Sequence, residues 1–357
     1  MPAPFLTLLR WPLWIAAVGT GAKSFADNPL LGSRRLNRWG LHRLRVRAAG
    51  AMTRWRRGRL AAGLSREDRA AFERQGYVEW PNVLPADAFE RMRDAILGQA
   101  WPARDMAQGH TITRRIHVDP AMLRAAPDLA ALLRHPRWRG LLRYVAGSKA
   151  EPLYYIQTIL THHEGLTHHQ DFPHDGGTGA AADAYDPQND IHADAFHPSM
   201  KAWLFLTDVA LEDGPLTYAA GSHRLTPQRL AWEHERALAA PGLDPLSARG
   251  SFRLTPDELA AMGLPQPTPF AVPANTLVVA DTFGFHARGH ATRPSVRVEL
   301  WAYARRNPFL PWTGLHLGSL PGLAHRRADI LWWLRARLTR FGGLVIPPTT
   351  PKRPDDR

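Results

Sequence analysis

Residues 167–175 read Thr167-His168-His169-Gln170-Asp171-Phe172-Pro173-His174-Asp175, which places three imidazoles and two carboxylates in nine positions. His169 and Asp171 stand two positions apart, and on an extended strand such residues point to the same side. One segment of backbone can therefore offer an imidazole nitrogen and a carboxylate oxygen to the same metal ion. The pair is incomplete, because a 2-His-1-carboxylate facial triad needs a second histidine from elsewhere in the chain.

A histidine suited to that role follows a short apolar strand expected at residues 277–280, which leads through Asp281-Thr282-Phe283-Gly284-Phe285 to His286. Eleven residues further on, Arg297 lies in an alternating strand expected at residues 296–303. Its face of that strand also carries Glu299, Trp301 and Tyr303. A buried arginine is costly unless it meets an anion, and a bidentate carboxylate ligand would satisfy its planar fork.

The composition limits which chemistry the chain can perform. There is no cysteine in the 357 residues, which excludes disulfides, zinc–thiolate sites, iron–sulfur clusters and thiol nucleophiles. Any metal must then be held by histidine, aspartate or glutamate. A chain of this length suits one catalytic domain with appendages, or two small domains.

The formal charge of +13 is concentrated at the two ends. Residues 1–64 contain eleven arginines and one lysine against a single acid, and residues 324–357 contain eight basic side chains against three acidic ones. Such asymmetry predicts an anionic partner at the ends, either a membrane surface or nucleic acid. Tryptophan and leucine interleaved with arginine fit a lipid surface better, so a nucleic-acid partner is not expected.

The order of expected elements predicts the fold class. Strands are expected at residues 153–161, 201–209, 277–280 and 296–303, and helices at 87–97 and 120–145, the latter broken at Pro127 and Pro136. Many short strands with long connections after a helical start indicate a mainly β jelly roll flanked by helices. Residues 226–262 are expected to be a helical insertion. Residues 176–198 are expected to be a lid loop, with His192 and His197 exposed on it or touching substrate.

Several motifs in their order resemble the phytanoyl-CoA dioxygenase family over roughly residues 70–306. The most specific is Glu212-Asp213-Gly214-Pro215-Leu216-Thr217 followed by Ala220-Gly221-Ser222-His223-Arg224, placed between the His-x-Asp pair and His286. Members of this family are non-haem Fe(II), 2-oxoglutarate-dependent oxygenases on a double-stranded β-helix of the cupin type. The resemblance implies such a domain over residues 65–310.

The resemblance also implies roles for individual residues. His169, Asp171 and His286 would bind Fe(II), and Arg297 would hold the distal carboxylate of 2-oxoglutarate. Trp203 and Gln157 would line the cosubstrate pocket. The sequence departs from the family at Arg288, which replaces a residue that often helps to hold the cosubstrate, and His290 follows close behind it.

The expected reaction is hydroxylation of an unactivated C–H bond in a small or lipid-linked substrate, with O2 consumed and succinate and CO2 released. Related halogenases carry a small residue in place of the carboxylate ligand, so Asp171 favours hydroxylation. The alternative is a catalytically inactive barrel that acts as a ligand-binding or membrane-surface module.

The two basic ends are interpreted as appendages of this domain. Residues 1–64 form an amphipathic segment, and residues 311–357 form a basic helix and a Pro-rich tail. Two alternatives are open for these basic segments. They lie on an anionic membrane surface, or they pack on the domain with their arginines solvated. The first alternative predicts a cytoplasmic protein attached to the inner face of a membrane. A cleaved signal peptide at residues 10–18 is a further alternative.

Overall fold

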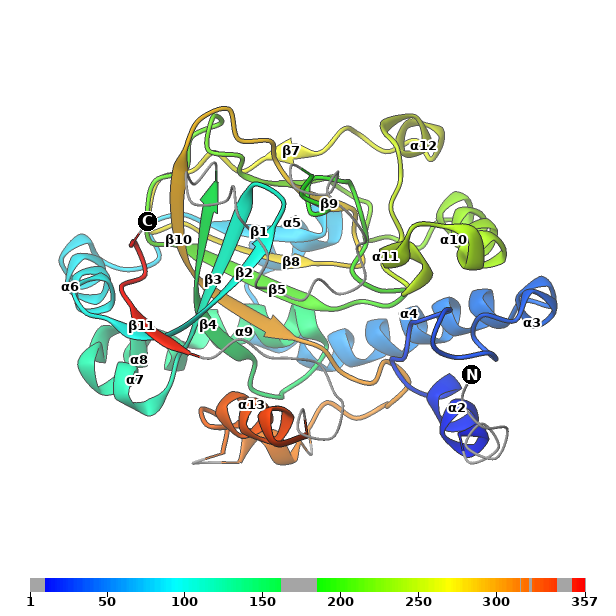
Figure 1. Ribbon diagram of the computed structural model, residues 1–357, viewed down its shortest axis with the longest axis horizontal. Coiled ribbons are helices and arrows are strands. Elements are labelled where there is room, and N and C mark those ends of the chain that lie inside the picture. The colour runs from blue at the N-terminus through cyan, green and yellow to red at the C-terminus, as the bar shows by residue number, and fades with distance from the viewer. Residues whose placement is uncertain (1–9, 162–184, 315, 321–322, 339–348, 357) are drawn as a thin grey trace.

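The computed structural model describes residues 10–161, 185–314, 316–320, 323–338 and 349–356 (Figure 1). An eight-stranded antiparallel sheet in the order β1-β8-β5-β10-β4-β3-β2-β11 forms the main layer. A second sheet in the order β7-β6-β9 faces part of it. In chain order the strands are β1 Tyr77–Trp80, β2 Trp101–Gln108, β3 Thr111–His117, β4 Leu153–Thr161, β5 Met200–Phe205, β6 Leu216–Tyr218, β7 Thr268–Pro269, β8 Leu277–Asp281, β9 His286–Arg288, β10 Ser295–Ala304 and β11 Thr350–Lys352.

Helices flank the sheets, mostly at the start of the chain and between β6 and β7. They are α2 Trp11–Val18, α3 Arg34–Arg38, α4 Leu41–Leu60, η1 Ala61–Gly63, α5 Arg66–Gln75, α6 Ala86–Leu97, α7 Pro120–Ala125, α8 Pro127–Arg134, α9 Pro136–Ala146, α10 Pro227–Ala239, η3 Ala240–Gly242, α11 Pro245–Ala248, α12 Pro256–Ala261, η4 Leu317–Ser319 and α13 Arg327–Leu338. The expected double-stranded β-helix with flanking helices is confirmed.

Proline sets the starts of several helices. The helices α7, α8 and α9 begin at Pro120, Pro127 and Pro136. Proline at the first helical position has no amide hydrogen to leave unpaired, and its fixed φ suits the first turn. The predicted breaks inside residues 120–145 are therefore helix starts.

Strand β10 holds the centre of the main sheet and sets the register of its neighbours. It pairs with β4 on one side, where Arg297 faces Ile159, and with β5 on the other, where Tyr303 faces Lys201. Strand β5 ends at Phe205, earlier than the expected residue 209. The chain turns there because the Thr207 hydroxyl accepts a hydrogen bond from the amide of Val298, and the Asp208 carboxylate accepts one from Ala274.

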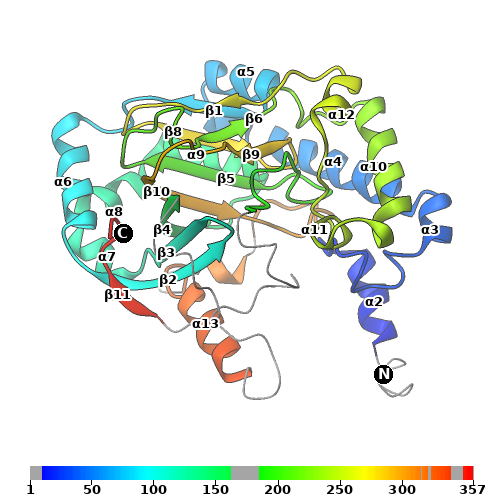
Figure 2. The same cartoon turned by 45° about the horizontal axis from the view of Figure 1, so that its top comes forward.

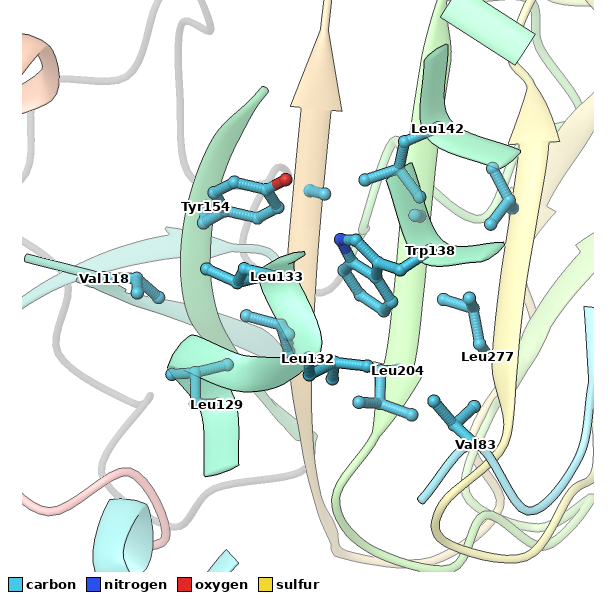
Figure 3. Packing of buried hydrophobic residues seen from close by; sticks show 14 of the residues in the cluster. Val83, Val118, Leu129, Leu132, Leu133, Trp138, Leu142, Tyr154, Leu204 and Leu277 are labelled. Carbon is cyan, nitrogen blue, oxygen red and sulfur yellow. The ribbon is translucent and has the colours of Figure 1, made fainter. Parts of the chain in front are cut away.

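The largest apolar cluster lies between the main sheet and the helices α6 to α9 (Figure 3). Trp138 of α9 is fully buried and points among Leu133, Leu142 and Leu204. Complete burial of a leucine such as Leu204 stabilises the fold by about 1.5–3 kcal/mol. This core leaves the other face of the sheet free to carry polar residues.

The basic helix α4 packs on the domain through three of its arginines. Arg56 donates to the carbonyl oxygens of Gly147, Pro308 and Leu310. Arg57 pairs with Asp281 at 2.8 Å, and Arg45 donates to carbonyls of residues 18–22. These three guanidinium groups are buried against oxygen atoms of the protein. The face of α4 that carries them therefore packs on the domain.

The helices α2 and α13 project from the same side of the molecule in both views (Figures 1 and 2). Among the described residues, no helix is both long and apolar enough to cross a membrane.

Candidate metal centre and active-site cavity

The two imidazoles of the candidate metal centre are joined by a backbone bridge. His286 begins β9, and its amide donates to the carbonyl of His192 at 3.0 Å, while the amide of His192 donates back at 2.9 Å. Asp194 follows two residues after His192, and its amide donates to the carbonyl of Thr282. The backbone bridge thus places His192 beside His286, although the two are 94 positions apart in the sequence.

Three donor atoms converge at this bridge. Asp194 Oδ1 lies 3.7 Å from His286 Nε2 and 3.9 Å from His192 Nε2. One ligand atom from each residue lies within 4.8 Å of the other two. Among the residues that the structure describes, these three side chains form the group of histidines and carboxylates that could hold a metal ion. Two imidazoles and one carboxylate form the facial triad of mononuclear non-haem iron sites.

Hydrogen bonds leave the Nε2 atom of each histidine available. His192 Nδ1 lies 2.7 Å from the carbonyl of Asp190, and His286 Nδ1 lies 3.0 Å from the carbonyl of Gly284. A carbonyl only accepts, so both Nδ1 atoms carry hydrogen and both Nε2 atoms carry the lone pair. His286 Nε2 is buried without a hydrogen-bond partner among the described residues, as a metal ligand would be.

The protonation states also fit metal binding. Burial holds the pKa of His192 well below its ordinary value, with the neighbouring His286 adding to the effect, and burial also lowers the pKa of His286. For Asp194, burial alone would raise the pKa, but the pKa is lowered, and the ammonium of Lys201 is the largest cause of that lowering. The site therefore holds two neutral imidazoles and one carboxylate, which are the forms that bind metal.

Two lysines hold the carboxylate ligand in place. Lys201 Nζ lies 2.7 Å from Asp194 Oδ2, which leaves Oδ1 directed at the histidines. Lys23 Nζ donates to the backbone carbonyl of Asp194 at 2.6 Å. Burial, followed by the charge of Arg305, lowers the pKa of Lys23 to about 8.

The three donors open into a cavity of about 540 Å³ between the two sheets. Arg297 lines the same cavity, is only 4% exposed, and its Nε has no hydrogen-bond partner among the described residues. Burial lowers its pKa to about 10. Glu299, two positions along β10, accepts a hydrogen bond from Gln157 Nε2 at 2.7 Å, and burial raises its pKa. A buried guanidinium of this kind needs an anion, as a keto-acid carboxylate would supply.

The structure brings four of the sequence-predicted site residues together. His286, Arg297, Trp203 and Gln157 all line the cavity. His169 and Asp171 lie outside the described residues and stay predictions. Arg288, the departure from the family pattern, also lines the cavity and forms an ion pair with Asp186.

Two side chains expected on a lid are buried instead. His192 is 3% exposed and His197 is fully buried, so the expected solvent exposure is wrong for both. For His192 the reason is that residues 192–194 form backbone hydrogen bonds with β9, Phe252 and Thr282. The sequence reasoning did not single out His192 and Asp194 as candidate ligands, although His192-Ala193-Asp194 repeats the spacing of His169-Gln170-Asp171 and lies closer in the sequence to strand β5.

A jelly roll that brings two imidazoles and a carboxylate together beside a buried arginine defines a mononuclear non-haem iron enzyme. The Phytanoyl-CoA dioxygenase (PhyH) family matches residues 72–250, half of the 357 residues. The chain belongs to the phytanoyl-CoA dioxygenase family and is a 2-oxoglutarate-dependent non-haem iron enzyme.

Three solved structures are among those similar to this chain. The non-haem alpha-ketoglutarate-dependent epimerase SnoN from nogalamycin biosynthesis is 23% identical over 66% of this chain and 81% of its own, with a TM-score of 0.41. HygX from Streptomyces hygroscopicus, with nickel and 2-oxoglutarate bound, is 17% identical over 81% and 98%, with a TM-score of 0.41. The carbocyclase SnoK is 22% identical over 68% and 84%, with a TM-score of 0.35. No curated protein matches the sequence.

Proposed function

We propose that the protein is a hydroxylase that inserts oxygen into an unactivated C–H bond of a small or lipid-linked substrate. In this proposal His192, Asp194 and His286 hold Fe(II), and Arg297 holds the distal carboxylate of 2-oxoglutarate. The observation that carries the proposal is the convergence of the three donor atoms in one cavity with a buried arginine whose Nε lacks a hydrogen-bond partner among the described residues. Bound Fe(II) and 2-oxoglutarate would supply the oxidation, with O2 consumed and succinate and CO2 released.

Each protein group has a separate task. The Asp190 and Gly284 carbonyls fix the tautomers of the two histidines, and Lys201 holds Asp194 so that one oxygen faces the metal position. Arg297 gives the keto acid its orientation along β10, where Gln157 and Trp203 also reach the cavity. A carboxylate at position 194 fills the third protein position, which favours hydroxylation over halogenation.

The alternative is a barrel that binds a ligand without turning it over. A complete donor set argues against it. The deciding experiment measures succinate released from 2-oxoglutarate with Fe(II) and O2. Arg297→Ala should raise the KM for 2-oxoglutarate while Fe(II) affinity stays near wild type, and Arg297→Lys should restore part of it. Absence of any Fe(II)-dependent succinate, with metal bound, would reject the oxygenase and favour the binding module.

We also propose that the enzyme attaches to the surface of an anionic membrane, on the cytoplasmic face. Both helices α2 and α13 project from the same side of the molecule (Figures 1 and 2), and each carries exposed apolar side chains, including Leu13 at 70% and Trp333 at 54%. Arg10 precedes α2, and the Arg337 guanidinium lies 4.3 Å over the Trp333 ring. Exposed tryptophan and leucine among arginines are typical of interfacial helices.

The membrane proposal has a direct test in vesicle flotation. The protein should float with vesicles that contain phosphatidylglycerol and less so with purely zwitterionic ones. A Leu13→Ser, Trp333→Ser double variant should lose most of this binding, while Leu211→Ser, which replaces an exposed leucine elsewhere, should retain it. Flotation that is absent for the wild type, or unchanged in the double variant, would contradict the proposal.

A further inference from the structure

Cationic side chains outnumber carboxylates in the active-site cavity. Among the described residues, the carboxylates that line it are Asp194 and Glu299. The cations that line it are Lys23, Arg115, Lys201, Arg288, Arg297 and Arg305. The two carboxylates of 2-oxoglutarate offset a part of this surplus, and a bound metal ion adds to it. Within the described part of the chain, the remaining positive charge is available to a second anion.

Most cationic side chains of the cavity lie toward the two ends of strand β10. Arg297 and Tyr303 are six residues apart on this strand, about 20 Å at the usual rise of a β-strand. Arg288 lies toward the Arg297 end, where it pairs with Asp186. Arg115 lies between the two ends, donates to Gln157, and places its guanidinium 4.7 Å over the Trp301 ring. At the other end, Lys201 is the register partner of Tyr303, and Arg305 follows two residues later.

Two cations at the Tyr303 end lack a carboxylate partner in the described chain. Lys23 donates to the carbonyl of Asp194, and Arg305 donates to the carbonyl of Gly21 at 2.8 Å. Both acceptors are neutral. Lys201 pairs with Asp194, a carboxylate that the metal would share. The three positive groups therefore gather beside the candidate metal centre with a single carboxylate between them.

An aromatic wall lies next to these cations. The Trp301 and Tyr303 rings are stacked, with 5.5 Å between centroids and 3° between planes, and Tyr155 lies 5.8 Å from Trp301. Trp332 of α13 also lines the cavity. Such a wall accepts a flat or apolar group by contact area and by stacking.

Several parts of this end, though not Lys201, lie outside the residues matched by the family. Lys23 comes from the N-terminal segment, Arg305 from the residue after β10, and Trp332 from α13, whereas the match spans residues 72–250. The two terminal appendages therefore contribute side chains to the cavity itself, which is how a shared barrel acquires its own substrate preference.

We propose that Lys23 and Arg305, together with Lys201, form a subsite for an anionic group of the substrate, a phosphate ester or a carboxylate, whose planar or apolar body lies against Trp301 and Tyr303. This inference rests on the proposed function, because it names the substrate class of that oxygenase. Hydrogen bonds between charged partners are about twice as strong as neutral ones, so this subsite would select for charge.

The test uses the full-length protein loaded with Fe(II) and saturating 2-oxoglutarate under argon, so that the cosubstrate position is filled and no turnover occurs. Calorimetry measures binding of 1-naphthyl phosphate, 1-naphthoate and the neutral 1-naphthol. At least one anionic probe should bind tenfold or more tightly than 1-naphthol, and the stronger of the two names the anion. Lys23→Ala and Arg305→Ala should each weaken it about tenfold, and Arg305→Lys should restore part of the affinity. Arg34→Ala, which removes an exposed charge from the same N-terminal segment, should leave it unchanged.

Equal affinity for the neutral and anionic probes would overturn the inference, as would anion binding unaffected in both variants. Wild-type thermal stability and 2-oxoglutarate affinity of Lys23→Ala and Arg305→Ala exclude misfolding as the cause of any loss. If 2-oxoglutarate fails to bind while an anionic probe binds in a Lys23-dependent manner, the subsite stands and the proposed function falls.

Discussion

His192 and His286 bond to each other through both backbone amides, and their rings lie 4.6 Å apart between centroids. The contact joins the segment before β5 to the first residue of β9. It fixes the spacing of two imidazoles by main-chain geometry, which is less adaptable than side-chain packing. The pair of histidines is therefore built into the fold before any metal arrives, and Asp194 needs only the correct side-chain orientation to complete the set.

This relationship yields a prediction about which His-x-Asp pair binds the metal. His192→Ala, Asp194→Ala and His286→Ala should each reduce Fe(II) affinity by more than the roughly 10–100-fold that loss of an outer partner costs. His169→Ala and Asp171→Ala should leave the affinity near wild type, because the other three donors already complete the triad. Anaerobic titration of Fe(II) measures this. If His169→Ala abolishes binding while His192→Ala does not, the first pair supplies the ligands.

Lys201 should influence metal binding without touching the metal. Its ammonium lies 2.7 Å from Asp194 Oδ2 and keeps Oδ1 directed toward the histidines. Lys201→Met should lower Fe(II) affinity about 10–100-fold, the usual cost of an outer partner. Lys201→Arg should restore much of the affinity, because its guanidinium can still form an ion pair with the same oxygen. A Lys201→Met protein that binds Fe(II) as wild type would show that Asp194 is oriented by other contacts.

The sequence predicted the barrel and one end of its site well, for reasons visible in particular residues. The alternating strand 296–303 placed Arg297, Glu299, Trp301 and Tyr303 on one face, and all four line the cavity. Strand 153–161 was predicted at its observed bounds. In both cases, a period of two along the strand decides which face a side chain takes.

The choice between two His-x-Asp pairs could not be made in the same way. Both pairs have the same local spacing, and only contact with β9 distinguishes His192. That contact is between residues 94 positions apart, so no periodicity reports it. The roles of Lys23 and Trp332 were hidden for a related reason, because segments that read as basic and amphipathic also reach the cavity.

A buried ion network predicts how stability depends on pH. Glu233 of α10 pairs with Arg229 at 3.0 Å and with His42 Nε2 at 2.8 Å, and all three side chains are buried. Burial alone would raise the pKa of Glu233, but Arg229 and His42 outweigh it and lower the pKa. A carboxyl group whose pKa is lower in the folded state contributes stability above its unfolded pKa, near 4.3, and that contribution is lost as the pH falls through the folded value.

Glu233→Gln should therefore lose about 3–5 kcal/mol at pH 7, because Arg229 is left buried without its counter-charge. The difference between variant and wild type should shrink as the pH falls below about 4. Urea unfolding at a series of pH values measures it. Glu73→Gln, which removes an exposed partner of Arg69, is the matched control and should leave stability unchanged. A difference that stays constant with pH would show that Glu233 is not ionised in the folded protein.

Gly284 is the position where one added methyl group should damage both the fold and the metal centre. A Cβ there would stand 1.8 Å from the Tyr218 hydroxyl oxygen and 3.0 Å from Ser222 Oγ. The Tyr218 hydroxyl donates to the carbonyl of Asp281, and Ser222 Oγ accepts from the amide of Phe285, so neither can move freely. The carbonyl of Gly284 itself fixes the tautomer of His286.

Gly284→Ala should accordingly lose about 1–3 kcal/mol of stability, as overpacked cores do, and bind Fe(II) more weakly because the Gly284 carbonyl shifts. Gly58→Ala provides the opposite control, since Gly58 is exposed within α4 and nothing lies within 4 Å of its added Cβ. That change should stabilise the protein by up to about 1 kcal/mol, the difference in helix propensity between the two residues. Thermal unfolding and Fe(II) titration of both variants measure these effects. A Gly284→Ala protein with wild-type stability and metal affinity would mean that the segment from Asp281 to His286 has room to adjust. Close packing of Tyr218 against this segment would then not be what positions His286.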